Sequence, residues 1–332
     1  MELMARIKEE ARQLDKTVVL PDSTDERTLR AAEVILREEL AKVVLLGDSK
    51  SLRDKASALG LEIGKVEIED PKTSKHRRDY IDELLEIRKH KNWNEEKAAQ
   101  KLNDPLYWAV MMIKKGHADA EVAGSLSATG DVLKPAFQIV KTQEGISRVS
   151  GAFIMISENK AFGKDGVMIF ADCAVNPTLT AREMAEVAVC SAHTAESLAG
   201  FKAKVAMLSF STKGSAEHEE VDKVRKATEI AREMAPNFEI DGEIQADAAL
   251  VEKVGKKKAP NSSVAGQANV LVFPDLNSAN IGYKLAQRLG NVQAIGPVLQ
   301  GLAGPINDLS RGCSVEDIVN TTAMACVQAA AK

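Results

Sequence analysis

The chain has 332 residues, of which 45% are hydrophobic and 28% are charged. This composition is typical of a folded globular protein, and it excludes a disordered tail, a fibrous repeat and a small disulfide-bonded scaffold. The net charge of -4 offers no basic excess to a nucleic-acid backbone, so we expect no nucleic-acid partner. No apolar stretch approaches the roughly 20 residues of a membrane span, so we expect no membrane association.

The cysteines and histidines give no sign of a metal site. The four cysteines form no CxxC pair and the five histidines are scattered, so we predict no bound metal. Reduced thiols and an N-terminal segment that carries early acids, with no apolar export region, predict a cytoplasmic protein.

Short apolar runs alternate with helical patterns along nearly the whole chain. The predicted strands are 17–21, 42–47, 120–124, 151–156, 167–170, 205–210 and 270–273, and the clearest helical patterns are 180–198, 219–235 and 278–290. Continuous apolar strands between helices indicate an α/β fold with mostly parallel sheets and helices on both faces.

The length predicts two domains. The runs 150–156 and 166–172 have a polar, glycine-containing linker and no helix between them, which predicts an antiparallel hairpin in a mixed sheet. We place the first α/β domain at 1–144 plus 300–332 and the second at 145–299. The segment from Gly301 contains one loop and one helix, which is too little for a domain of its own. The charged region 71–104 is predicted to be helical and solvated.

Three segments share a layout of strand, then small polar residues and glycine, then helix: 124–131, 209–216 and 307–314. A helix N-terminus exposes free N–H groups, and glycines and hydroxyls there let an anion approach the backbone. The candidate anion-binding hydroxyls are Ser127, Thr129, Ser211 and Thr212. The same residues also serve as ordinary caps and turns. None of the loops is a Walker A or GxGxxG motif, so ATP and NAD are not indicated.

The third loop is the most specific. Arg311 stands just before a predicted helix start, beside the hydroxyls of Ser310 and Ser314, and arginine is suited to forked contact with phosphate or carboxylate. Asp317 has two interpretations. Its spacing from Ser314 is that of a capping box, and it is also a candidate catalytic carboxylate.

Four further residues each allow a structural and a functional interpretation. Arg88 is either a solvated helix charge or a substrate contact, and Lys134 is either an exposed lysine or a phosphate contact. Cys313 is either a packed thiol or a nucleophile for which the sequence places no base. Asp275 is either a helix cap or a catalytic carboxylate.

At these residues the sequence resembles the phosphate acetyltransferases (phosphotransacetylases). The matching stretches follow the family order and cover essentially the full length; they are Phe170–Pro177, Asp241–Gln245, Val264–Val270, Phe273–Asn277, Gly296–Leu302 and Pro305–Val319.

The resemblance implies reversible transfer of an acetyl group between acetyl phosphate and coenzyme A, with coenzyme A as a substrate and no bound cofactor. It implies two domains of the isocitrate/isopropylmalate dehydrogenase-like type, an active site in the cleft between them, and a homodimer. It also implies direct attack in a ternary complex, without an acyl-enzyme or an obligatory metal.

The resemblance also assigns roles to residues. Ser310, Arg311 and Asp317 fall on catalytic positions of the family, and Arg88 falls on its substrate-binding arginine. At Lys134 the family commonly has arginine, so the charge is kept and the forked geometry is lost. Ala279 stands where a glycine is frequent.

The proposed chemistry is attack of the coenzyme A thiolate on the acetyl carbonyl, with Asp317 as candidate base. Moving a proton from an ordinary thiol at pKa ~8.5 to an ordinary aspartate at ~3.9 is uphill by about 6 kcal/mol. We therefore expect Ser310, Arg311 and the helix N-terminus to stabilise the thiolate.

Three alternatives stay open at this point. They are a phosphate butyryltransferase or another acyl-length variant, a non-catalytic module that binds coenzyme A or phosphate, and a decarboxylating dehydrogenase of the same fold. A pocket distinguishes one methylene by only ~1–3 kcal/mol, so the motifs do not separate acyl lengths. The dehydrogenase is disfavoured because the chain lacks a carboxylate cluster for a metal.

Overall fold

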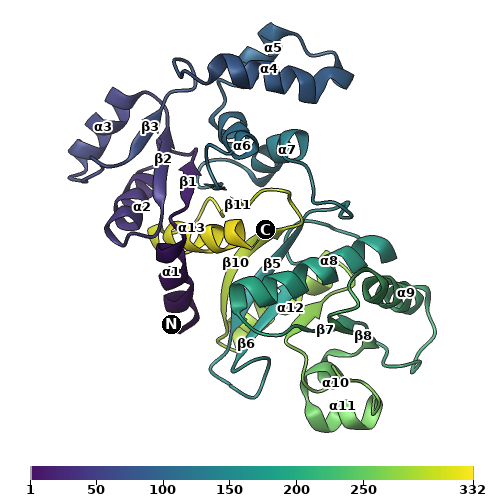
Figure 1. Cartoon of the computed structure of the whole chain (residues 1–332). Helices are drawn as coiled ribbons and strands as arrows, with labels where there is room; N and C mark the ends of the chain where they lie inside the picture. Colours follow the sequence, from purple (N-terminus) through teal and green to yellow (C-terminus); the bar gives the residue numbers. More distant parts are fainter. Residues whose placement is uncertain (1, 332) are drawn as a thin grey trace. The chain divides into compact units, whose positions relative to one another are not determined.

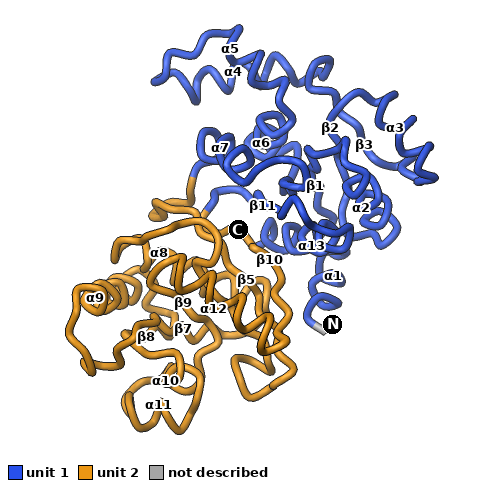
Figure 2. Tube along the Cα trace, turned by 180° about the vertical axis from the view of Figure 1, so that it is seen from behind, with its two compact units in different colours: residues 1–141, 302–332 blue, residues 142–301 orange. Residues whose placement is uncertain are grey.

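The computed structural model describes residues 2–331. The chain divides into two compact units, coloured separately in Figure 2. Unit 1 comprises residues 1–141 and 302–332, and unit 2 comprises residues 142–301.

Unit 1 is built on a five-stranded sheet in which every neighbouring pair of strands is parallel, in the order β11-β4-β1-β2-β3 (Figure 1). The strands are β1 (Thr17–Leu20), β2 (Lys42–Leu46), β3 (Glu67–Glu69), β4 (Ala120–Ala123) and β11 (Ile306–Asp308). The buried, β-branched runs of β1 and β2 made these two strands predictable. Strands β3 and β11 were not predicted, because each has only three residues and carries two polar side chains.

Nine helical segments accompany this sheet within the described residues. They are α1 (Glu2–Leu14), α2 (Glu26–Arg37), α3 (Ser49–Ala58), α4 (Arg77–Arg88), η1 (Lys89–Lys91), α5 (Glu95–Lys101), α6 (Pro105–Lys115), α7 (Thr129–Ile139) and α13 (Val315–Ala330). Short polar side chains cap several of them; Asp25, for example, accepts from the Arg27 N–H at the start of α2. Helix α13 packs on β1 and β4, and α6 packs on β4.

Two details of unit 1 correct the sequence analysis. The region 71–104 is only partly helical, because 71–76 precede α4, and it is not fully solvated, because α4 buries Tyr80, Ile81 and Leu84. The segment from Gly301 contains the strand β11 as well as a loop and a helix.

Unit 2 is built on a six-stranded mixed sheet in the order β10-β5-β6-β9-β7-β8. The strands are β5 (Ser150–Ile156), β6 (Val167–Ala171), β7 (Lys204–Leu208), β8 (Glu239–Ile244), β9 (Val270–Val272) and β10 (Gln293–Gln300). The predicted hairpin is confirmed: β5 and β6 are antiparallel, with Phe153 opposite Phe170 and Ile156 opposite Val167. Strand β10 is also antiparallel to β5, and the remaining pairs are parallel.

The helical segments of unit 2 are α8 (Ala181–Thr194), the π-helical turn η2 (Ala195–Ala199), α9 (Glu219–Met234), α10 (Ala246–Leu250), α11 (Glu252–Lys258) and α12 (Leu276–Leu289). Helix α8 begins with a complete capping box between Thr180 and Glu183. It packs on β6, β7, β9 and β10, while α12 packs on β6 and β10. The predicted α/β class with mostly parallel sheets is confirmed.

Candidate active site

The segments that follow the carboxyl ends of β1, β4 and β11 carry four of the candidate site residues of unit 1: Ser127, Thr129, Ser310 and Arg311. Strand β1 has β2 and then β3 on one side, and β4 and then β11 on the other. The chain therefore changes direction across the sheet at β1, and open parallel sheets bind ligands at the carboxyl ends of their strands at such a point. The segments that follow these three strands are tied together by the hydrogen bonds described below.

The loop after β4 folds around the carboxylate of Asp22, which follows β1. Oδ2 of Asp22 accepts the N–H groups of Gly124 at 2.8 Å and Leu126 at 3.2 Å, and Oδ1 accepts the Ser127 hydroxyl at 2.8 Å. Ser127, predicted as an anion-binding hydroxyl, thus already donates its proton to a carboxylate of the chain itself.

Thr129, at the first position of α7, is tied to β11 in the same way. Its hydroxyl donates to Oδ2 of Asp308 at 2.5 Å. Thr129 is exposed, whereas Asp308 retains only 5% of its accessible surface. Oδ1 of Asp308 is buried and has no hydrogen-bond partner among residues 2–331. Burial raises the pKa of Asp308 to about 6, against the lowering effect of the Thr129 hydrogen bond and with a smaller contribution from the charge of Asp22.

Gly124 permits this close approach of the two loops. Its φ is +103°, and a Cβ there would lie 2.5 Å from Oδ1 of Asp308 and 2.6 Å from the Leu309 nitrogen. The Leu309 N–H donates to the carbonyl of Ala123 at 2.7 Å. The glycine of the predicted anion loop therefore serves the packing of β4 against β11.

Arg27, which the sequence analysis did not single out, joins three segments. Its guanidinium donates to the carbonyls of Arg311 and Cys313 and to that of Ser125, each at 2.8 Å, and to the Asp25 carboxylate at 2.6 Å. In the sequence Arg27 has the appearance of an ordinary charge in the first turn of a helix, so no local signal marks it.

The side chains of Ser310 and Arg311 remain accessible. The Ser310 hydroxyl accepts the N–H of Gly312 at 3.2 Å. The Arg311 guanidinium is exposed, and it forms no hydrogen bond or ion pair with any of the described residues, 2–331. Since Arg27 fixes the backbone carbonyl of Arg311, the loop is held while its guanidinium is left available to a ligand.

Asp317 forms the capping box that its spacing predicted. Its Oδ2 accepts the N–H of Ser314 at 2.8 Å and the Ser314 hydroxyl at 2.9 Å, and its own N–H donates to that hydroxyl. The cap engages one of the two carboxylate oxygens of an exposed side chain. The structural interpretation of Asp317 is therefore confirmed, and its role as a base stays a prediction.

The structure supports the structural interpretation of two residues, Cys313 as a packed thiol and Asp275 as a helix cap. The Cys313 thiol is buried, and burial raises its pKa, which fits a packed thiol. Asp275 caps α12 by accepting the N–H of Ser278 at 2.8 Å.

Arg88 and Lys134 lie on the packed helices α4 and α7. The Arg88 guanidinium stands 5.2 Å from the centre of the Trp93 ring, and its Nε is buried without a hydrogen-bond partner among the described residues. Arg88 is thus not the solvated helix charge of the structural interpretation. Lys134 is exposed.

Ser211 and Thr212 follow β7 in unit 2, and both are buried. The Ser211 hydroxyl donates to Glu243 at 3.0 Å, and that of Thr212 donates to the Gln245 side chain at 3.2 Å. Glu243 also accepts the N–H of Gly214 at 2.8 Å and pairs with Arg225 at 3.2 Å. Burial raises the pKa of Glu243, but these donors outweigh burial and lower it overall.

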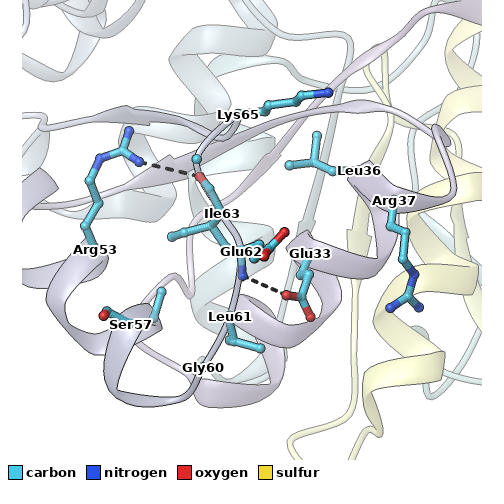
Figure 3. Close-up of a pocket in the computed structure, with 12 residues that line it drawn as sticks. Glu33, Leu36, Arg37, Arg53, Ser57, Gly60, Leu61, Glu62, Ile63 and Lys65 are labelled. Carbon is cyan, nitrogen blue, oxygen red and sulfur yellow. Dashed lines mark hydrogen bonds between the residues drawn. The ribbon is translucent and has the colours of Figure 1, made fainter.

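Two pockets lie away from the loops that follow β1, β4 and β11. One, of about 930 Å³, lies beside α2 and α3; Figure 3 shows Arg37, Arg53 and Lys65 among its lining residues. None of the nine predicted site residues, all within the described chain, lines it. The other, of about 340 Å³ in unit 2, has Lys213 and Arg232 each 2.5 Å from the buried Asp241.

The described residues contain no group of three or more histidine, cysteine, aspartate or glutamate side chains arranged to hold a metal ion. No helix among them has both the length and the hydropathy that a membrane span requires. What unit 1 offers is an exposed arginine, a serine hydroxyl and a helix N-terminus beside loops from three parallel strands. These features define an α/β protein with a site suited to an anionic substrate.

Comparison with known proteins identifies the class. The family profile described as Phosphate acetyl/butaryl transferase matches residues 2–326. A phosphate acetyltransferase of Thermoanaerobacterium thermosaccharolyticum is 53% identical over 329 residues, which cover 99% of this chain and 100% of that protein. One of Clostridium acetobutylicum is 50% identical over 329 residues, covering 99% of each. A solved phosphotransacetylase from Streptococcus pyogenes superimposes with a TM-score of 0.95 at 45% identity, covering 100% of this chain and 99% of that chain.

The chain therefore belongs to the phosphate acetyl/butaryl transferase family. The family predicted from the sequence is confirmed, and so is the prediction that the chain is an enzyme.

Proposed function

We propose that the chain catalyses reversible transfer of an acetyl group between acetyl phosphate and coenzyme A, by direct attack of the thiolate in a ternary complex. The relatives that match over the full length carry the printed name phosphate acetyltransferase, which favours acetyl over butyryl transfer. The single observation in the structure that carries the proposal is the exposed guanidinium of Arg311, on a loop whose backbone carbonyl at residue 311 is fixed by Arg27.

Arg311, Ser310 and Asp317 are the proposed catalytic residues. Arg311 would hold the phosphoryl oxygens and the oxyanion that develops on the acetyl carbonyl. Ser310 would donate to the thiolate or to the phosphate, because its hydroxyl accepts the Gly312 N–H and keeps its own proton available. Asp317 would take the thiol proton through the carboxylate oxygen that the capping box leaves unused.

The proposed substrate contacts differ in their support. Arg88 has a buried Nε without a partner among the described residues, which fits a group that awaits a ligand. Lys134 is exposed, and Ser127 and Thr129 belong to the loop after β4. Ser211 and Thr212 remain predicted contacts on the strength of the sequence alone, since their hydroxyls are engaged inside unit 2.

The remaining parts of the proposal follow from the resemblance. They are coenzyme A as a substrate with no bound cofactor or metal, a homodimer and a cytoplasmic location. The pocket of unit 2 is lined by the cations Lys213, Arg232 and Lys258 and by a single carboxylate, that of Asp241, which would suit a polyanionic substrate such as coenzyme A.

The assay that tests the function is phosphate- or arsenate-dependent turnover of acetyl-, propionyl- and butyryl-coenzyme A by the purified protein. We expect acetyl-coenzyme A to have the highest kcat/KM. A preference for butyryl-coenzyme A would establish the acyl-length alternative, and no turnover of any thioester would overturn the proposal.

Arg311→Ala tests the site. We expect kcat/KM to fall by an amount that corresponds to a loss of about 2–4 kcal/mol of transition-state stabilisation, because a preorganised donor to the developing charge is lost. The thermal midpoint should hardly change, because the Arg27 bonds reach the backbone of residue 311 and not its side chain. Arg30→Ala, which removes an exposed arginine of the same unit, is the matched control and should leave kcat/KM unchanged. Near-normal turnover of Arg311→Ala would remove Arg311 from the mechanism.

A further inference from the structure

Two hydroxyls after β4, those of Ser127 in the loop and of Thr129 at the start of α7, direct their protons toward carboxylates of the chain. Ser127 donates to Asp22 at 2.8 Å, and Thr129 donates to Asp308 at 2.5 Å. A hydroxyl has one proton to donate, so each oxygen can only accept a hydrogen bond from a ligand while its carboxylate is ionised. A fully deprotonated anion has no proton to give, so these hydroxyls do not recognise it.

The two carboxylates differ in how they are compensated. Asp22 accepts two backbone N–H groups in addition to the hydroxyl. Asp308 accepts only the Thr129 hydroxyl, and its buried Oδ1 has no partner among the described residues. Because an uncompensated buried charge is costly, Asp308 is the one of the two that readily accepts a proton.

The surroundings of Asp308 supply little positive charge. Asp22 is the charged group that raises its pKa together with burial. The elements packed against β11 are β4, α7 and α13. Their charged residues are Glu121 on β4, Asp131 and Lys134 on α7, and Glu316 and Asp317 on α13.

We propose that Thr129 and Asp308 form a pair that binds the proton-bearing phosphoryl group of the substrate and holds its proton during the reaction. Thr129 is the group in contact with substrate, and Asp308 acts through it as a positioning residue. The inference rests on the proposed function, because it takes the loop after β4 as the phosphate loop.

The step balances in both directions. When acetyl phosphate forms, a phosphate oxygen attacks the thioester carbon, the C–O bond forms, and the C–S bond breaks with its electron pair leaving on sulfur. The phosphate proton passes to Oγ1 of Thr129 while the Thr129 proton passes to Oδ2 of Asp308, which becomes neutral. The departing thiolate takes one proton from the solvent, directly or through Asp317, and Asp308 releases one proton to the solvent. When the thioester forms, the neutral Asp308 returns a proton through Thr129 to the departing phosphate.

The test compares variants in the acetyl phosphate-forming direction across the pH range. Asp308→Asn keeps the size of the side chain but cannot take the Thr129 proton, and Thr129→Val removes the hydroxyl at nearly constant shape. We expect kcat of both variants to fall about 100-fold, the size of a general acid–base contribution. The acidic limb of the wild-type kcat profile should be absent from Asp308→Asn, and Thr129→Ser should restore most of the rate lost in Thr129→Val.

Sulfate is a second probe, because it carries no proton near neutral pH. An asparagine at 308 can turn its NH₂ toward Thr129 and free the hydroxyl proton for a ligand. We therefore expect the inhibition constant of sulfate, divided by the KM for phosphate, to be lower in Asp308→Asn than in the wild type. An unchanged ratio would contradict the proposal.

Glu121→Gln is the matched control, since Glu121 is also fully buried in unit 1 with neither oxygen partnered among the described residues. It should leave kcat and the pH profile unchanged. If the wild type turns over normally and Asp308→Asn keeps both its kcat and its acidic limb, the inference fails while the proposed function stands. If the wild type forms no acetyl phosphate, it is the proposed function that fails.

Discussion

The loop after β4 in unit 1 and the loop after β7 in unit 2 are each organised by buried carboxylates of the chain itself. In unit 2, Glu243 is compensated by the Ser211 hydroxyl, the Gly214 N–H and the Arg225 guanidinium. In unit 1, Asp308 receives one hydroxyl and no cation from the described residues. The pKa shifts follow this difference: the pKa of Glu243 is lowered and that of Asp308 is raised.

The comparison shows what a loop rich in glycine and hydroxyls can mean. Such a loop suits an external anion, and it equally suits a carboxylate brought in from a neighbouring strand. Where a cation and backbone donors complete the internal site, the carboxylate stabilises the loop. Where they are absent, a buried carboxyl remains able to exchange a proton, and we assign function to that loop.

The largest expected effect on stability concerns the cation of unit 2. Arg225→Ala should lower the free energy of unfolding by about 3 kcal/mol, because it leaves the buried charge of Glu243 without its ion pair. Denaturation by urea measures this loss. Lys226→Ala, which removes an exposed ion pair with Glu229 on the same helix, should cost under about 1 kcal/mol. Equal stability of the two variants would show that the loop in unit 2 does not depend on its cation.

Asp308→Asn should have the opposite effect on stability and raise the free energy of unfolding. A carboxyl with a folded pKa of about 6, above its ordinary pKa of 3.8, stabilises the fold fully only below pH ~4, and that contribution is lost as the pH rises through about 6. Removing it should raise the free energy of unfolding at pH 8 by up to about 3 kcal/mol and change it little at pH 4. Urea denaturation at the two pH values measures the effect.

Glu243→Gln is the counterpart of that variant in unit 2. Because the pKa of Glu243 is lowered in the folded state, its contribution is present above the unfolded pKa and is lost as the pH falls through the folded value. This substitution should therefore destabilise the protein at pH 8. If both variants shift stability in the same direction at pH 8, the contrast between the two loops is wrong.

Much of the fold was predictable from local pattern. The strands β1, β2, β5 and β6 are apolar runs, and the starts of α8 and α12 carry recognisable caps. Strand β11 was not predictable in this way, because its Asn307 and Asp308 are polar and buried. What makes it a strand is pairing with β4, a partner far away in the sequence.

The same distinction between local pattern and distant contact applies to the residues of the site. Residue type and spacing indicated Ser310, Arg311 and the capping box of Asp317, because these signals lie within a few residues of one another. Arg27 and Asp308 were not predicted, because their roles depend on contacts to segments 284 and 179 residues away, respectively. A local pattern in the sequence does not indicate a contact partner that lies so far away along the chain.

The smallest expected effect separates the two roles of Asp317. Ser314→Ala removes the hydroxyl of the capping box and should lower the free energy of unfolding by about 1 kcal/mol, with turnover retained. Asp317→Asn should lower stability by a similar amount, because a neutral amide accepts less strongly from the Ser314 N–H and complements the helix N-terminus less well than a carboxylate. If Asp317 is also the base, only Asp317→Asn loses turnover, by about 100-fold or more. Melting temperatures and kcat of the two variants decide the question, since a purely structural Asp317 predicts that their activities remain equal.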